Sequence, residues 1–249
     1  ILVDANKLFI SNAPGLSGPR FSFDKKNSFL RSIKSFDFNT EIEIDLHYKT
    51  KGIYLYTLAD SRNITYTYHY SLSVLPNTNY SPRKADDRVG HFQTMYQDYT
   101  DILTESPYVR YINRWNLKKS NSTLSLSKPI KPIEFWLENT IPVEFRDAMK
   151  EGILAWNEAF EAIGFKDAIV VYQMPDDADW DPADVRYSTV RWLIQPGVGI
   201  GVGPSRADPF TGEIYDADIR ISADYVRFFH REFNQFIDPM IENSYDEYI

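Results

Sequence analysis

The sequence of 249 residues predicts an α+β fold, in which a β-rich N-terminal part precedes a mixed, twisted sheet with one long packing helix. Three observations lead to this prediction. Aromatic residues make up 15% of the chain, and they favour sheets because flat side chains pack well on a pleated surface. Residues 40–48 and 64–74 alternate between apolar and polar types, whereas residues 142–163 repeat their apolar side chains with helical spacing.

Strands are predicted throughout the first half of the chain. Residues 40–48 place apolar side chains on one face and polar ones on the other, which is typical of a half-buried strand. Residues 52–58 and 64–74 are predicted strands separated by a short polar turn, so they are expected to pair as a β-hairpin. The apolar face of the first strand consists of Ile42, Ile44, Leu46 and Tyr48.

A change of composition near residue 120 predicts two domains. Residues 75–90, rich in Pro, Asn and Asp, indicate an irregular connection. Residues 118–132 are rich in Ser, Lys and Pro, which is typical of a linker or an extended crossing segment. We therefore expect a β-rich domain of unassigned role over 1–127 and a second domain over 128–249.

A long helix is the most distinctive element predicted for the second domain. It follows a strand at 133–139 and is expected to span 142–163, with Thr140 as its N-cap and Pro142 in its first turn. Gly164 is expected to end the helix in a left-handed conformation, with the following Phe packing back. The predicted buried stripe consists of Phe145, Met149, Gly152, Ile153, Trp156, Ala159, Phe160 and Ile163.

Three further strands and a final helix complete the predicted second domain. The strands are expected at 167–174, 185–194 and 214–222, and the helix over 223–237. The strand at 214–222 is imperfectly phased, because its apolar members are Ile214, Ala217, Ile219 and Ile221. The final helix would present one apolar side, formed by Val226, Phe229, Phe233 and Phe236.

Composition excludes several classes of protein. The formal net charge of −8 argues against a general nucleic-acid binder. The absence of cysteine excludes disulfides, a thiolate nucleophile, cysteine-ligated zinc and iron–sulfur clusters. No apolar run approaches the roughly 20 residues of a membrane span, so no transmembrane segment is predicted.

A glycine run at 197–204 is the most unusual stretch of the sequence. Glycines alternate with Val and Ile, but the spacing fits neither the dinucleotide-binding fingerprint nor a phosphate-binding loop. In an extended strand the bare face would let another backbone approach, which favours an edge strand that pairs with a peptide. A flexible loop or tight bend is the alternative, and from these residues alone it is the simpler interpretation.

Two acidic stretches are candidate cation sites. Asp177, Asp179 and Asp181 begin like a calcium loop, but Pro182 and Ser188 stand where an EF-hand needs Gly and a bidentate Glu. The alternatives are a looser calcium site and, more simply, solvated Asx turns. The second stretch, 206–218, is predicted to form a plain hairpin around a turn. Its carboxylates are Asp208, Glu213, Asp216 and Asp218.

The histidines provide little support for a metal site or a catalytic triad. None of the four is followed by Glu or has a second His at helical spacing; they are His47, His69, His91 and His230. His47 and His69 share the polar faces of predicted strands, but two ligands are fewer than zinc uses. Ser188 has no glycine elbow around it. The sequence therefore predicts no catalytic residue and no metal ligand in this chain.

The second half resembles a family of large bacterial zinc-dependent metalloproteases with a metzincin-type catalytic domain. Residues 128–169, 179–192 and 203–219 carry the resemblance in the expected order, and 80–92 and 108–117 extend it to the first half. The resemblance implies a twisted mixed sheet, a long packed helix, and an antiparallel edge strand that pairs with the substrate backbone. The residues implied to bind substrate are Gly199, Ile200, Gly201, Val202, Gly203 and Pro204.

The resemblance also implies hydrolysis of peptide or protein substrates by a zinc-activated water, and a periplasmic or extracellular location. The family's zinc motif, H-E-x-x-H-x-x-G-x-x-H, does not occur in this sequence. We therefore expect a fragment of a protease: zinc belongs to the intact parent, and this chain alone is inactive. Self-association through an exposed sheet surface is a further expectation.

Two alternatives remain open at the level of sequence. One is a stand-alone, non-catalytic module that binds peptide or protein with its edge strand, and the other is a calcium-stabilised surface domain. If the chain is part of an intact protease, proline at Val202 is expected to weaken the pairing with substrate because it removes a backbone N–H.

Overall fold

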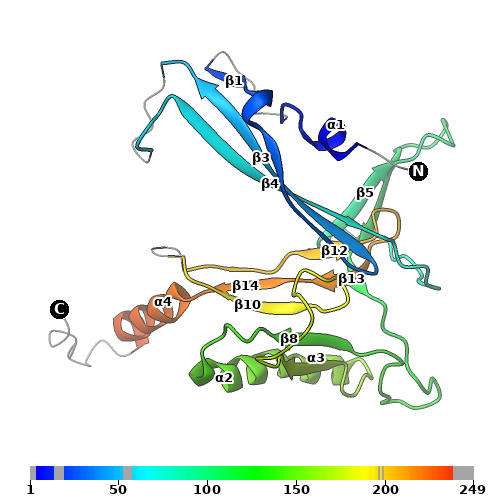
Figure 1. Ribbon diagram of the computed structural model, residues 1–249. Coiled ribbons are helices and arrows are strands. Elements are labelled where there is room, and N and C mark those ends of the chain that lie inside the picture. The colour runs from blue at the N-terminus through cyan, green and yellow to red at the C-terminus, as the bar shows by residue number, and fades with distance from the viewer. Residues whose placement is uncertain (1–3, 14–19, 53–57, 196, 198, 238–249) are drawn as a thin grey trace, which may run out of the picture. The chain divides into compact units, whose positions relative to one another are not determined.

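The computed structural model describes residues 4–13, 20–52, 58–195, 197 and 199–237 (Figure 1). The chain divides into two compact units, Ile1–Val74 and Leu75–Ile249. Strands predominate and helices are few, so the predicted α+β class is confirmed. The domain boundary predicted at 127/128 falls inside the second unit.

The first unit is an antiparallel sheet built around one long strand. This central strand, β3 (Asn39–Thr50), pairs along one side with β1 (Phe21–Phe23) and β2 (Phe29–Ser35), and along the other with β4 (Asn63–Ser73). The strand expected at 52–58 lies largely outside the described residues. The strand expected at 64–74 is β4, and it pairs with β3. Two short helices, α1 (Ala5–Phe9) and η1 (Lys25–Asn27), accompany the sheet.

The core of the first unit follows the alternation of β3. Ile44, Leu46 and Tyr48 are completely buried, and Ile42 is 5% exposed. The Tyr48 hydroxyl accepts a hydrogen bond from the Ala13 backbone N–H at 3.0 Å. The predicted division of this strand into an apolar and a polar face is therefore confirmed.

The second unit contains a five-stranded mixed sheet covered by two helices. Its order is β11 (Gly201–Val202), β14 (Ile219–Ser222), β10 (Thr189–Leu193), β8 (Ile133–Leu137) and β9 (Ile169–Gln173). The last four run parallel to one another, and β11 is antiparallel to β14. Helices α2 (Val143–Leu154) and α3 (Trp156–Ala162) lie along one side of it (Figure 1).

Smaller elements surround this sheet. A three-stranded sheet joins β12 (Ser205–Ala207), β13 (Glu213–Ala217) and β7 (Arg114–Trp115), and a hairpin joins β5 (Gln93–Gln97) to β6 (Tyr108–Ile112). The described chain ends in α4 (Asp224–Glu232), which continues into a π-helical turn, η2 (Phe233–Ile237). The predicted final helix is therefore present, although its last turn is not α-helical.

The predicted long helix differs from expectation at its start. It begins after Pro142, and Thr140 does not cap it, because the Thr140 hydroxyl donates instead to Glu138 at 2.7 Å. The helix is also interrupted at Ala155, between α2 and α3.

The end of the helix agrees with the prediction. Gly164 has φ +91°, and its N–H donates to the Glu161 carbonyl while the Phe165 N–H donates to the Phe160 carbonyl. These two bonds form a Schellman motif, which satisfies carbonyls that the helix itself leaves unpaired.

The apolar stripe predicted for this helix is too wide. Phe145, Met149, Ile153 and Phe160 pack against the core of the sheet. The other half of the predicted stripe is exposed and consists of Gly152, Trp156, Ala159 and Ile163. A sheet covers only the side of a helix that touches it. Asn157 determines which side of this helix faces the sheet. Its side chain bonds both the N–H and the carbonyl of Ile169 at 2.9 Å.

The strand predicted at 214–222 is divided at Asp218. Its first part, β13, belongs to the three-stranded sheet, and its second part, β14, belongs to the five-stranded sheet. The imperfect phasing arises inside β13, where the register with β12 shifts between Asp216 and Ile214 and leaves Tyr215 as an extra residue. On the other side of this irregularity, Ala217, Ile219 and Ile221 keep one phase and contribute to the same core.

Candidate functional site

The glycine run leads into the edge of the five-stranded sheet. Gly201 lies opposite Ile221, and Val202 lies opposite Arg220, in antiparallel register. Among the described residues, β14 is the only strand that pairs with β11. An antiparallel edge strand within Gly199–Pro204 is therefore confirmed, although regular strand geometry is confined to two of the six residues.

Two hydrogen bonds establish which backbone groups of this segment face outward. The Ser222 N–H donates to the Ile200 carbonyl at 3.0 Å, and the Asp218 N–H donates to the Pro204 carbonyl at 3.2 Å. Alternate residues of an antiparallel strand direct their backbone groups to opposite sides. Ile200, Val202 and Pro204 therefore face β14, whereas Gly201 and Gly203 direct their N–H and carbonyl groups away from the sheet.

This orientation corrects the expectation for proline at Val202. The N–H of Val202 lies on the side of Arg220, so proline there would damage the sheet itself. The N–H that an added strand would use belongs to Gly201 or Gly203.

The two faces of the edge segment have different surroundings. Ile200 and Val202 are 43% and 47% exposed and form an apolar face. On the glycine face, a Cβ at Gly199 would lie 3.2 Å from the Phe228 Cβ, so the glycine there permits the close approach of α4. A Cβ at Gly201 would meet nothing within 4 Å. The centre of the edge segment is therefore open.

A buried polar cluster lies where the edge segment continues into β12. Asp216 is 1% exposed, and its carboxylate meets the Arg206 guanidinium at 3.1 Å. The Ser188 hydroxyl donates to the same carboxylate at 3.3 Å, and the Thr189 hydroxyl donates to Asp218 at 2.8 Å. Burial raises the pKa of Asp216 to about 7, the neighbouring Asp218 charge adds to the rise, and Arg206 opposes it.

The acidic residues of 206–218 have several separate roles. The Asp208 carboxylate accepts the N–H groups of Phe210 and Thr211, which is an Asx turn. Glu213 accepts from the Asn116 amide at 2.9 Å and from the Thr78 hydroxyl. The plain hairpin predicted here is present, but the partners from distant segments could not be identified from spacing alone.

The acidic stretch 175–187 also forms turns. Asp181 accepts the Ala183 N–H at 2.9 Å, and Asp184 accepts the Arg186 N–H at 3.0 Å. Asp184 is buried and paired with the Arg186 guanidinium, whereas Asp177 and Asp179 are exposed. The Asx-turn interpretation accounts for these contacts.

Three of the four histidines have described partners, and these partners differ. His47 contacts the Thr65 hydroxyl at 2.7 Å, His69 contacts the Glu41 carboxylate at 2.6 Å, and His230 contacts the Asn234 amide at 3.2 Å. The described part of the chain contains no group of three or more His, Asp or Glu side chains arranged to hold a metal ion.

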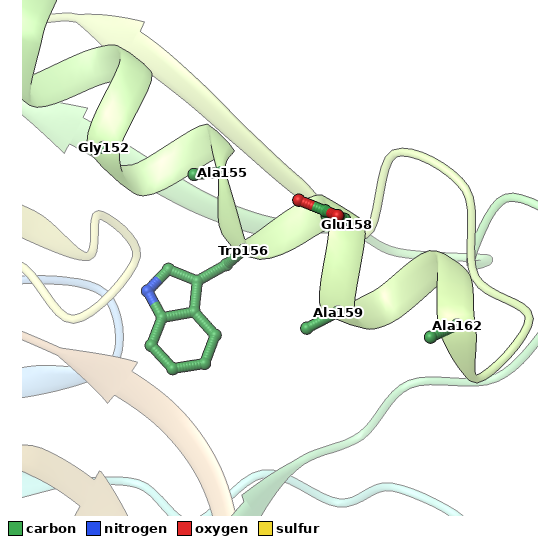
Figure 2. A pocket seen from close by; sticks show the side chains of 6 residues that line it. All are labelled: Gly152, Ala155, Trp156, Glu158, Ala159 and Ala162. Atoms are coloured by element: carbon green, nitrogen blue, oxygen red, sulfur yellow. The ribbon is translucent and has the colours of Figure 1, made fainter.

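Two other concave surfaces lie on the helices of the second unit. Figure 2 shows a hollow beside α2 and α3, lined by small residues, Glu158 and the exposed ring of Trp156. An apolar groove lies between α4 and Phe145, and it is lined in part by Val226, Phe229, Phe233 and Phe236. The lining of the groove also includes His230 and Glu232.

Comparison with known families gives one result. Residues 1–120 match the model of a family described as a domain of unknown function (DUF5117), so the match covers the first unit and extends into the second. Neither the curated proteins nor the solved structures yielded a match. In the described residues, no helix has the length and apolarity that crossing a membrane requires.

Proposed function

We propose that this chain is the peptide-binding part of a zinc-dependent metalloendopeptidase, and that an extended substrate lies along the outer edge of β11. The observation that carries the proposal is the outward direction of the Gly201 and Gly203 backbone groups. Backbone pairing of this kind gives affinity for an extended peptide with little dependence on its side chains. The resemblance to metzincin-type proteases supports the assignment to a peptidase.

The zinc that this function implies does not fit the residues of this chain. The sequence has no His-Glu pair, and the three histidines with described partners each contact a different group. No catalytic step is derived from these residues, and the chain alone is expected to lack peptidase activity. The zinc ligands and the general base of the proposed enzyme would come from another segment.

A proline at Gly201 tests the proposed binding edge. Gly201→Pro removes one outward N–H and is expected to weaken peptide binding about fivefold to tenfold, since a hydrogen bond contributes about 1 kcal/mol. Peptides selected on the wild-type protein from a random decapeptide library serve as probes, and their affinity is measured by fluorescence anisotropy.

Gly201→Ala is the matched control for this substitution. It keeps the N–H, and its Cβ would meet nothing within 4 Å, so affinity should stay within about twofold. Equal binding by the proline and alanine variants, with both folded by circular dichroism, would refute pairing at β11.

A stand-alone peptide-binding module is the second candidate, because the same edge would serve it. The two are separated by the gene sequence that follows residue 249 and by the metal content of the complete gene product. An in-frame H-E-x-x-H, one zinc per chain and peptidase activity sensitive to a chelator support the protease. A complete product without zinc or activity supports the binding module.

A further inference from the structure

We propose that Asp216 is a proton-dependent latch that sets how firmly the β11–β12 segment is held on the sheet. The inference rests on the proposed function in one respect only, namely that this segment is the peptide-binding edge. It adds a form of regulation to that site.

The geometry places Asp216 at the junction between the edge segment and the body of the second unit. Arg206, in β12, lies opposite Asp216 in the strand register and forms an ion pair with it at 3.1 Å. The edge residues Gly201–Pro204 precede β12 directly in the chain. Any movement of β12 away from β13 therefore also loosens the bond between Pro204 and Asp218.

The charged and polar groups that face Asp216 come from three segments. Arg206 faces it from β12, Asp218 lies at the break just after its strand, and Ser188 faces it from the segment before β10. The Ser188 hydroxyl also accepts the Ala217 N–H at 3.2 Å, so it holds the backbone beside Asp216. The buried Asp216 carboxylate therefore has one cation, Arg206, and one like charge, Asp218, among its neighbours.

When the β11–β12 segment detaches, Asp216 loses Arg206 and gains water. Its pKa then falls toward the ordinary value of 3.8, although Asp218 remains beside it, whereas burial in the closed state raises the pKa to about 7. The closed state therefore binds more protons than the open state between these two values. By linkage, the closed segment is most stable at acidic pH and loses stability as the pH rises through the closed-state pKa.

The expected size of this effect follows from the same linkage. Between about pH 5 and pH 7 the equilibrium constant for opening should rise by up to about tenfold per pH unit, and above that range it should level off. An edge that is ordered at acidic pH and loosened at alkaline pH would offer its Gly201 and Gly203 groups to peptides more effectively at acidic pH.

Amide hydrogen exchange in the free protein tests the latch. The N–H groups of Asp218 and Ser222 report on it, because they donate to the Pro204 and Ile200 carbonyls. Their exchange, corrected for the intrinsic effect of pH, should accelerate from pH 5 to pH 7 and then level off. The Glu138 N–H, which donates to the Val190 carbonyl, is the internal control and should show no such trend.

Two variants separate the latch from a general effect of pH. Asp216→Asn keeps the shape of the side chain without its titration, so the corrected exchange rates should become independent of pH. Asp218→Asn removes the neighbouring negative charge and should move the transition to lower pH. The ¹³C shift of the Asp216 carboxyl in the wild-type protein gives a titration that does not depend on the folding of either variant.

The outcomes separate this inference from the proposed function. A pH-independent exchange of Asp218 and Ser222 in the wild type, or the same trend in Asp216→Asn, would overturn the latch. Neither result depends on peptide binding. If the pH trend were found but the Gly201→Pro experiment showed no peptide binding at β11, the latch would be supported and its role in regulating peptide binding would be refuted.

Discussion

Ile44→Ala is expected to lower the free energy of unfolding of the first unit by about 2–5 kcal/mol. Ile44 is completely buried at the centre of β3, where it pairs with Leu30 on one side and Tyr68 on the other. Truncation removes three buried carbons and leaves a cavity, because neighbouring strands cannot collapse into it.

The measurement can assign this loss to the first unit. All five tryptophans lie in the second unit, so their fluorescence reports on that unit alone, whereas far-ultraviolet circular dichroism reports on both. Urea unfolding should therefore show an earlier transition by circular dichroism without an equal shift in the fluorescence of the tryptophans.

Ile33→Ala is the matched control in the same sheet. Ile33 lies in β2 opposite Ile42, but it is 48% exposed, so its truncation should cost about 1 kcal/mol or less. A similar loss for both variants would show that the alternation of β3 does not define the core of this unit.

The sequence predicted best those features that depend on one segment alone. The two faces of β3 follow from alternation over nine residues, and the end of the long helix follows from a single glycine. Both are local consequences of backbone geometry, and the structure contains both.

Features that depend on contacts between distant segments were predicted less well. The helix 142–163 carries more apolar residues than its contact with the sheet can bury, so its buried arc could not be identified without β9 and Asn157. Thr140 has the right chemistry for a cap, but its hydroxyl donates to Glu138.

The candidate edge strand also shows what sequence-based prediction could not establish, here for single backbone groups. Alternation of Gly with Val and Ile predicts the two faces of the strand, but it does not show which backbone groups face the sheet. That assignment required the bonds to Ser222 and Asp218, which show that the glycines, and not Val202, direct their N–H groups away from the sheet. The pairing of Asp216 with Arg206 and Ser188 likewise depends on register and on a segment about thirty positions away.

Gly164→Ala is expected to destabilise the second unit by about 2–4 kcal/mol, since it combines backbone strain with a steric clash. The residue has φ +91°, a conformation that L-amino acids rarely adopt. An added Cβ would also lie 2.5 Å from the Ser125 carbonyl oxygen and 2.6 Å from the Lys119 Nζ. Relief of that clash would displace the 119–127 segment, whose Ser127 N–H donates to the Gly164 carbonyl at 3.2 Å.

Gly152→Ala is the control for the direction of the expected change in stability. Gly152 lies inside α2, and a Cβ there would meet nothing within 4 Å, so alanine should stabilise the unit by about 0.5–1 kcal/mol. Tryptophan fluorescence during urea unfolding measures both variants in the same unit. Shifts in opposite directions are expected from one chemical change, because the glycine at 164 ends the helix whereas the glycine at 152 only weakens it. Shifts in the same direction would show that the Schellman motif does not hold this end of α3 in place.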